Sequence, residues 1–178
     1  MALSKPRVAE QGSLRGKKII KYLDDQKYKY EIIEHKTTYT AWDVSQTEKI
    51  KPQEVAKSLV MKVDNDCLVA MITANRNLDK QKLLKVINAQ RKKLKLKNYK
   101  KIDFAKEVWM KKNLPGKVGA VPPFKGILKL DIYIDSLLAK NKKIYAGTGE
   151  YVYSFRINVS QFLKIENPVK GSFSKSKK

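Results

Sequence analysis

One lysine of this 178-residue chain stands where an ammonium group is chemically unusual. Lys57 interrupts an apolar run in residues 51–63, KPQEVAKSLVMKV. Pro52 and Glu54 suit the first turn of a helix, which puts Lys57 near a helix-to-strand junction. Burial of an ammonium group costs several kcal/mol unless the group is paired or reaches water. The position therefore indicates either an anionic or carbonyl partner, or a lysine whose stem packs while its head group stays in water.

A second stretch, residues 113–126, is too rich in glycine and proline for a regular element. It contains Gly116, Gly119, Pro122, Pro123 and Gly126. Glycine lets a backbone approach a substrate closely, and paired prolines make a loop rigid. The stretch is therefore expected to be a loop of defined shape rather than a helix or strand. The plain alternative is that the cluster only makes turns.

The remaining reactive side chains form no familiar catalytic set. His35 is the only histidine, and its expected place at a strand end favours a structural or pocket-rim role over that of a general base. Cys67 lies in an apolar run, which indicates a buried thiol. Asp43, Asp131 and Asp135 do not have the spacing of a paired-carboxylate site. A single cysteine also excludes a multi-cysteine metal site.

The charge of the chain favours a polyanionic partner. Lys and Arg number 39 against 17 Asp and Glu, a net charge of +22, and residues 80–101 hold ten of the basic residues and no acidic one. Nucleic acid is the first partner to consider. A lysine-rich proteome is the alternative, although the excess is clustered. The candidate nucleic-acid contacts are Arg91, Lys92, Lys93, Lys95 and Lys97.

The sequence predicts no membrane partner. No apolar run approaches the roughly 20 residues that span a bilayer, and the first residues lack the apolar core of a signal peptide. The basic cluster also lacks the broad apolar face of a membrane-surface helix. We therefore expect a cytoplasmic protein.

Periodicity and turn residues predict a mixed α/β domain without repeats. Its boundaries are expected as a flexible arm at 1–16, the domain at 17–167 and a basic disordered tail at 168–178. Helices are predicted at 17–26, from the cap Thr40 to about 50, at 52–57, from Asp79, at 103–110 and from the cap Ser160. Strands are predicted at 30–35, 130–134, 144–145 and 153–159, with a hairpin of 59–63 and 67–74 turning at 64–66.

In combination, these features resemble the YbaK and prolyl-tRNA-synthetase-associated editing-domain family, the free-standing aminoacyl-tRNA deacylases. The similarity runs from about Tyr30 to Leu163. Its motifs are YEIIEH, the lysine of VAKSL, a hairpin, the loop G-x-x-G-x-x-P-P-F-x-G at 116–126, a strand ending in Ile-Asp at 134–135, and Ala-Gly at 146–147. The resemblance implies a mixed α/β fold with a curved, mostly mixed sheet or partial barrel surrounded by helices.

The resemblance also implies an activity: hydrolysis of the ester that joins a wrongly attached amino acid to the 3′ end of tRNA, without metal or cofactor. The usual substrates are small (alanine, cysteine or serine), often on tRNA for proline, and the implied partners are the tRNA acceptor end and an aminoacyl-tRNA synthetase. The matching catalytic positions are Lys57, Gly119 and Pro123. The matching substrate-binding positions are His35, Thr40, Ser58, Pro122, Phe124, Ala146, Gly147 and Ser154, and residues 37–41 would set the pocket size.

Two departures from the family pattern leave a second hypothesis open. Several relatives carry a serine where this chain has Ala146, and some carry an aspartate where Tyr153 or Ser154 stands. One hypothesis is therefore a trans-acting deacylase. The other is a non-catalytic RNA-binding or synthetase-associated module that keeps the fold.

Overall fold

The computed structural model of the protein describes residues 18–178, so the predicted arm at 1–16 lies outside the described residues. The helices are α1 (Lys18–Asp25), α2 (Ala41–Thr47), α3 (Lys80–Lys93), α4 (Glu107–Asn113), α5 (Lys125–Leu128), α6 (Ser136–Ala139) and α7 (Val159–Glu166), with a 3-10 turn at Pro52–Glu54. The strands are β1 (Tyr30–Glu34), β2 (Ala56–Val63), β3 (Asp66–Thr73), β4 (Arg76–Leu78), β5 (Ile102–Phe104), β6 (Asp131–Asp135), β7 (Lys143–Gly147), β8 (Tyr153–Asn158), β9 (Val169–Gly171) and β10 (Ser174–Ser176).

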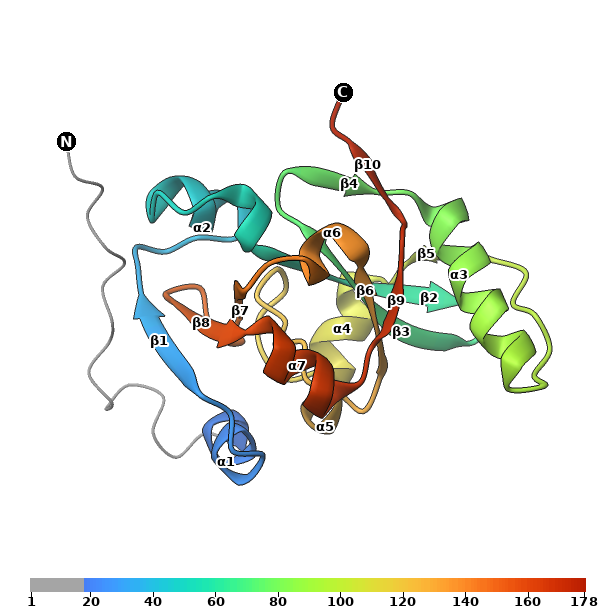
Figure 1. Cartoon of the computed structure of the whole chain (residues 1–178), viewed down its shortest axis with the longest axis horizontal. Helices are drawn as coiled ribbons and strands as arrows, with labels where there is room; N and C mark the ends of the chain where they lie inside the picture. Colours follow the sequence, from blue (N-terminus) through green and yellow to red (C-terminus); the bar gives the residue numbers. More distant parts are fainter. Residues whose placement is uncertain (1–17) are drawn as a thin grey trace.

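Two main sheets and a short strand pair make up the framework (Figure 1). The larger sheet has the order β5-β2-β3-β6-β9, with antiparallel pairing at β2 and parallel pairing of β6 with β3 and β9. The smaller sheet, β1-β8-β7, is antiparallel, and β4 pairs with β10. A bridge between Val55 and Tyr145 joins the two main sheets. The mixed α/β class is confirmed, and the sheets do not close into a barrel.

Local sequence signals account for several of these elements. The Thr40 side chain accepts a hydrogen bond from the N–H of Asp43 and caps α2, and Asp79 caps α3 in the same way through Lys82. The predicted hairpin is confirmed as β2–β3. The α7 cap differs from the prediction, because Asn158 rather than Ser160 accepts the first free N–H.

Two predicted helices are wrong. Residues 52–57 form only the three-residue 3-10 turn, and Lys57 is the second residue of β2, paired with Ile72 of β3. Residues 103–110 divide into β5, which pairs with the end of β2, and the start of α4. In both places pairing with a neighbouring strand outweighs a local spacing that is compatible with a helix.

The predicted disordered tail is also wrong. Residues 169–171 extend the large sheet as β9, and 174–176 pair with β4 as β10. Between them Phe173 is completely buried. The polar, basic composition of this segment does not suggest an ordered structure. Burial of the single Phe173 ring nevertheless anchors it.

Apolar side chains form separate clusters on the two faces of the large sheet. Val60, Val69 and Ile134 belong to the cluster between the sheets, where Phe124 also lies. Met61 and Ile72 belong to the cluster under α3, which includes Phe173. Side chains on the opposite faces of β2 therefore pack into different apolar clusters.

Within residues 18–178 no helix is long and apolar enough to cross a membrane.

A buried carboxylate ties α7 to α1 and α5. Glu166 accepts hydrogen bonds of 2.8 Å from the hydroxyls of Tyr22 and Tyr28 and from the N–H of Lys125. Burial, together with the nearby carboxylate, raises the pKa of Tyr28 well above its ordinary value, so its hydroxyl remains a donor. The Glu166 carboxylate thus links three segments of the fold through hydrogen bonds.

We expect Glu166→Ala to lower the free energy of unfolding by about 3 kcal/mol, because buried donors lose their acceptor. Glu166→Gln should cost less, since one acceptor oxygen remains. Urea unfolding followed by circular dichroism measures both. Equal stability of Glu166→Ala and the wild type would contradict the connecting role.

Candidate functional site

A small cavity of ≈ 30 Å³ lies where the smaller sheet meets the start of β2. The N-terminal end of α2 forms one wall, the end of β7 and the start of β8 form another, and the glycine-proline loop closes it. Its lining residues are His35, Thr38, Thr40, Ala41, Val44, Val55, Ala56, Gly119, Ala120, Tyr145, Ala146, Gly147, Glu150, Tyr153 and Ser154. The cavity therefore collects segments that are more than 100 residues apart in the chain.

Two glycines allow the loop to close on the cavity. A Cβ atom at Gly119 would lie 2.3 Å from the carbonyl oxygen of Tyr39, and φ there is +87°. A Cβ atom at Gly147 would lie 2.5 Å from the carbonyl oxygen of Ala120. Glycine is thus required at both positions by the close approach of neighbouring backbone, and at Gly119 also by its left-handed conformation.

A hydrogen-bonded serine and histidine face this cavity. The Oγ atom of Ser154 lies 2.9 Å from Nε2 of His35, and Nδ1 of His35 lies 2.8 Å from the carbonyl oxygen of Lys36. A carbonyl oxygen can only accept, so Nδ1 carries a proton in this arrangement. In the neutral ring Nε2 is then an acceptor, and Ser154 donates to it. Both side chains are buried.

Six of the eleven predicted catalytic or substrate-binding positions line this cavity. The cavity is lined by His35, Thr40, Gly119, Ala146, Gly147 and Ser154, and Thr38 and Ala41 from the expected size-setting segment join them. Pro122 faces a neighbouring hollow beside α1, and Pro123 is buried. The assignment of Phe124 is corrected, because its ring is completely buried among Tyr28, Phe155 and Phe162.

Lys57 does not line the cavity. Alternate residues of a strand face opposite sides, so Lys57 points away from the face to which Ala56 contributes. Its Nζ atom donates a 3.0 Å hydrogen bond to the carbonyl oxygen of Arg76. Burial, followed by the charge of Lys177, lowers the pKa of the Lys57 ammonium group. The carbonyl partner that the sequence suggested is thus present, and the ammonium is only partly buried.

The cavity side of β2 and β3 carries polar atoms without partners. The Oγ atom of Ser58 and the Oγ1 atom of Thr73 are buried, and neither has a hydrogen-bond partner among the described residues. Thr73 pairs with Ala56, and Ser58 lies two residues further along β2, so these side chains share the face of Ala56. Ser58 therefore lies beside the cavity without lining it.

Residues 35–165, about three quarters of the chain, match the family described as the aminoacyl-tRNA editing domain. The chain belongs to the aminoacyl-tRNA editing domain family. This match begins at His35, directly after β1. It covers the Lys57 strand, the glycine-proline loop and the Ser154 strand, and it ends before β9. No curated protein matches the sequence significantly.

Solved structures confirm the fold. A proposed trans-editing enzyme for prolyl-tRNA synthetase superposes with a TM-score of 0.76 at 17% identity, covering 94% of this chain and 100% of that one. The hypothetical protein APE2540 superposes with a TM-score of 0.75 at 16% identity, covering 89% and 100%. At such identities the similarity establishes the YbaK-like trans-editing fold rather than a substrate.

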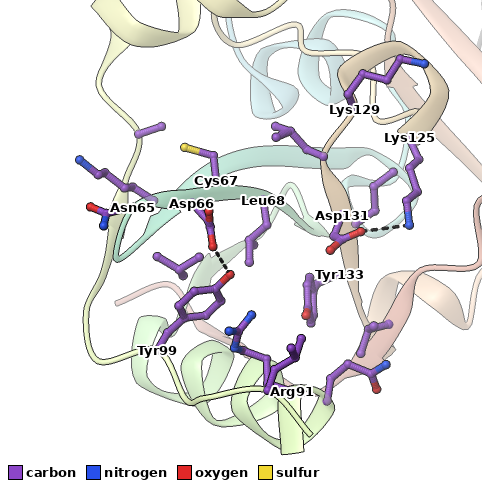
Figure 2. A pocket seen from close by; sticks show the side chains of 18 of the residues that line it. Asn65, Asp66, Cys67, Leu68, Arg91, Tyr99, Lys125, Lys129, Asp131 and Tyr133 are labelled. Carbon is purple, nitrogen blue, oxygen red and sulfur yellow. Dashed lines mark hydrogen bonds and ion pairs between the residues drawn. The ribbon is translucent and has the colours of Figure 1, made fainter. Parts of the chain in front are cut away.

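The editing domain also carries a much larger groove, of ≈ 1250 Å³, at the other end of β2 (Figure 2). It lies between the β2–β3 turn, the end of α3 and the start of β6. Its labelled carboxylates are engaged: Asp66 accepts from the hydroxyl of Tyr99, and Asp131 pairs with Lys125 at 3.0 Å. Burial raises the pKa of the Cys67 thiol, which disfavours the nucleophilic thiolate. This groove is suited to binding rather than to acid–base chemistry.

The predicted nucleic-acid contacts lie at this groove and beside it. The guanidinium of Arg91 stacks on the ring of Tyr99 at 3.8 Å. Lys92, Lys93, Lys95 and Lys97 are exposed on the last turn of α3 and the following loop. Aromatic and cationic groups are thus combined on one surface, as they are in proteins that bind single-stranded nucleic acid.

The serine–histidine pair is the feature that sequence reasoning missed. His35 and Ser154 were each assigned to the pocket, but not to one another, because 119 positions separate them. Only the antiparallel pairing of β1 with β8, in which Glu34 lies opposite Tyr153, brings them together. That register is not visible from the spacing of residues in the sequence.

Proposed function

We propose that the protein is a trans-editing hydrolase that deacylates misacylated tRNA in the cytoplasm, with water as the attacking group and no metal. The observation that carries the proposal is the Ser154–His35 pair facing the cavity in a chain of the aminoacyl-tRNA editing domain family. An ester is reactive enough to be hydrolysed by an oriented water and a nearby base.

The geometry supports His35 as the acceptor of the water's proton. In the proposed step, water attacks the ester carbonyl carbon while its proton passes to Ser154, whose own proton moves to Nε2 of His35. The Nδ1–H bond to the Lys36 carbonyl holds the ring in the required tautomer. The ribose oxygen then leaves with the proton from His35. The products are a free amino acid and tRNA.

The glycine-proline loop would supply the electrostatic part of catalysis. The backbone of Gly119 borders the cavity, and its N–H has no hydrogen-bond acceptor among residues 18–178. We assign this N–H to the oxyanion that develops on the ester carbonyl. Pro123 keeps its proposed role as the rigid end of the loop, while Ala146 and Gly147 form the opposite wall.

The size of the cavity supports a small amino acid. Its ≈ 30 Å³ leaves room for a small side chain but not for a large one. Val44, Val55 and Ala41 make part of the wall apolar. We therefore propose alanine, cysteine or serine as the ester-linked residue. Proline tRNA, with a synthetase as partner, is the first carrier to test, because one structural neighbour is a proposed trans-editing enzyme for prolyl-tRNA synthetase.

The experiment is deacylation of alanyl-, cysteinyl- and seryl-tRNA for proline by the wild type and by Lys57→Ala. We expect hydrolysis by the wild type and a loss of about 10- to 100-fold in kcat/KM for the variant, because a charge-assisted contact to the tRNA terminus is removed. Lys164→Ala is the matched control, because Lys164 is exposed on α7 and lines neither the cavity nor the large groove. Circular dichroism verifies that all three are folded.

The competing function is a non-catalytic RNA-binding or synthetase-associated module. It would be established if folded wild-type protein binds tRNA but hydrolyses none of the three esters. Salt dependence of binding does not separate the two, since both contact the phosphate backbone.

A further inference from the structure

The segment that follows α7 reaches the Lys57 end of β2 along an anchored path. The Oδ2 atom of Asp135 accepts hydrogen bonds from the N–H groups of Phe173, at 2.8 Å, and Ser174, at 3.0 Å. Arg76 donates from Nε to the Ser174 hydroxyl, at 2.8 Å, and from Nη2 to the Ser174 carbonyl, at 3.2 Å. The course of residues 169–176, the β9–β10 segment, is thus fixed by buried contacts. It lies outside the family match.

Lys177 follows this segment and brings an ammonium group to an exposed aromatic ring. Its Nζ atom lies 4.6 Å from the centre of the Trp42 ring. Trp42 is 41% exposed and belongs to α2, whose residues Ala41 and Val44 line the cavity. A cation over a ring face is a favourable contact, and it occupies the surface on which a nucleobase could stack.

Two ammonium groups, those of Lys57 and Lys177, lie near one another at this point. The Lys57 ammonium binds the Arg76 carbonyl, and Lys177 is close enough to depress the pKa of Lys57. Within residues 18–178, none of the side chains of Lys57, Arg76 and Lys177 forms a salt bridge. Like charges in proximity disfavour one another, and an anion between them would relieve the repulsion.

We propose that Lys177, Lys57 and Trp42 form a subsite for one nucleotide of the single-stranded 3′ end of tRNA, with the base on Trp42 and a phosphate between the two ammonium groups. This inference rests on the proposed function and adds to it a residue from outside the family's shared domain. The Lys177 ammonium covers the ring while no RNA is bound. When a base takes the ring face, the displaced ammonium moves to the phosphate attached to that base.

The test is binding of uncharged tRNA, which needs no hydrolysis. Dissociation constants are measured for intact tRNA and for the same tRNA without its last three nucleotides, using the wild type, Lys177→Ala and the control Lys175→Ala. Lys175 is on β10, two positions away, and its charge acts on Asp79 instead. We expect Lys177→Ala to weaken binding of intact tRNA about 10-fold, and to leave binding of the shortened tRNA unchanged. Lys175→Ala should change the dissociation constants of the two RNAs by the same factor.

Fluorescence supplies a second readout in a Trp109→Phe background, where Trp42 is the remaining tryptophan. The trinucleotide CCA should quench Trp42 in this protein, and Lys177→Ala should weaken that response. The proposed subsite would be ruled out if Lys177→Ala and Lys175→Ala weakened binding of intact tRNA equally. An unchanged Trp42 fluorescence at saturating CCA would also rule it out. If binding behaves as expected but no ester is hydrolysed, the subsite stands and the proposed activity fails.

Discussion

Ser154→Ala is expected to lower the single-turnover rate of deacylation by about 100-fold, and His35→Ala by about 1000-fold, within the range for general-base catalysis. The physical reason is the 2.9 Å hydrogen bond between Ser154 and Nε2 of His35, along which the proton is transferred in the proposed step. His35→Ala removes the proton acceptor itself, whereas Ser154→Ala leaves a ring that water can still reach directly. Single-turnover kinetics with excess enzyme measures the chemical step apart from tRNA release.

Ser160→Ala is the matched control, because Ser160 is exposed on α7. It should hydrolyse the ester at the wild-type rate. Full activity in folded Ser154→Ala and His35→Ala proteins would exclude the pair from proton transfer. In that event the 2′-hydroxyl of the terminal ribose would be the remaining candidate for moving protons.

Phe173→Ala is expected to lower the free energy of unfolding by about 3–5 kcal/mol. The ring is completely buried in the cluster under α3. Its backbone N–H binds Asp135, and its carbonyl oxygen accepts from the N–H of Asp79, so loss of the ring also loosens the β9–β10 segment. The midpoint of urea unfolding and its slope measure the change.

Phe104→Ala is the comparison, since that ring is 49% exposed on β5. Phe104→Ala should lower the free energy of unfolding by clearly less than Phe173→Ala does. Equal effects of the two substitutions would mean that the β9–β10 segment contributes little to the folded state. Phe173→Leu, which keeps most of the apolar volume, should recover part of the lost stability.

Elements with a strong local signal were predictable from sequence. Thr40 and Asp79 each cap a helix with a side chain that competes for free N–H groups, and this chemistry is complete within four residues. The β2–β3 hairpin depends on a polar turn between apolar runs. The mixed fold class and the membership of the editing-domain family followed from such segments taken together.

Features that depend on distant partners were not predictable. Lys57 lies in a strand because β3 supplies hydrogen bonds to the residues around it, and the β9–β10 segment is ordered because β6 and β4 pair with it. Phe124, which lies in a motif typical of a functional loop, packs into the core instead. Each of these outcomes is decided by tertiary pairing that outweighs local preference.

The position of β2 between the two hollows has a consequence for recognition. Ala56 at its start borders the small cavity, and Lys62 and Val63 at its end border the large groove. An eight-residue strand spans about 23 Å from first to last residue. On the proposed assignment, a free aminoacyl ester contacts only the cavity, whereas an RNA that also contacts the large groove gains binding energy at both ends of β2. The fold therefore favours esters carried on a folded RNA over small esters.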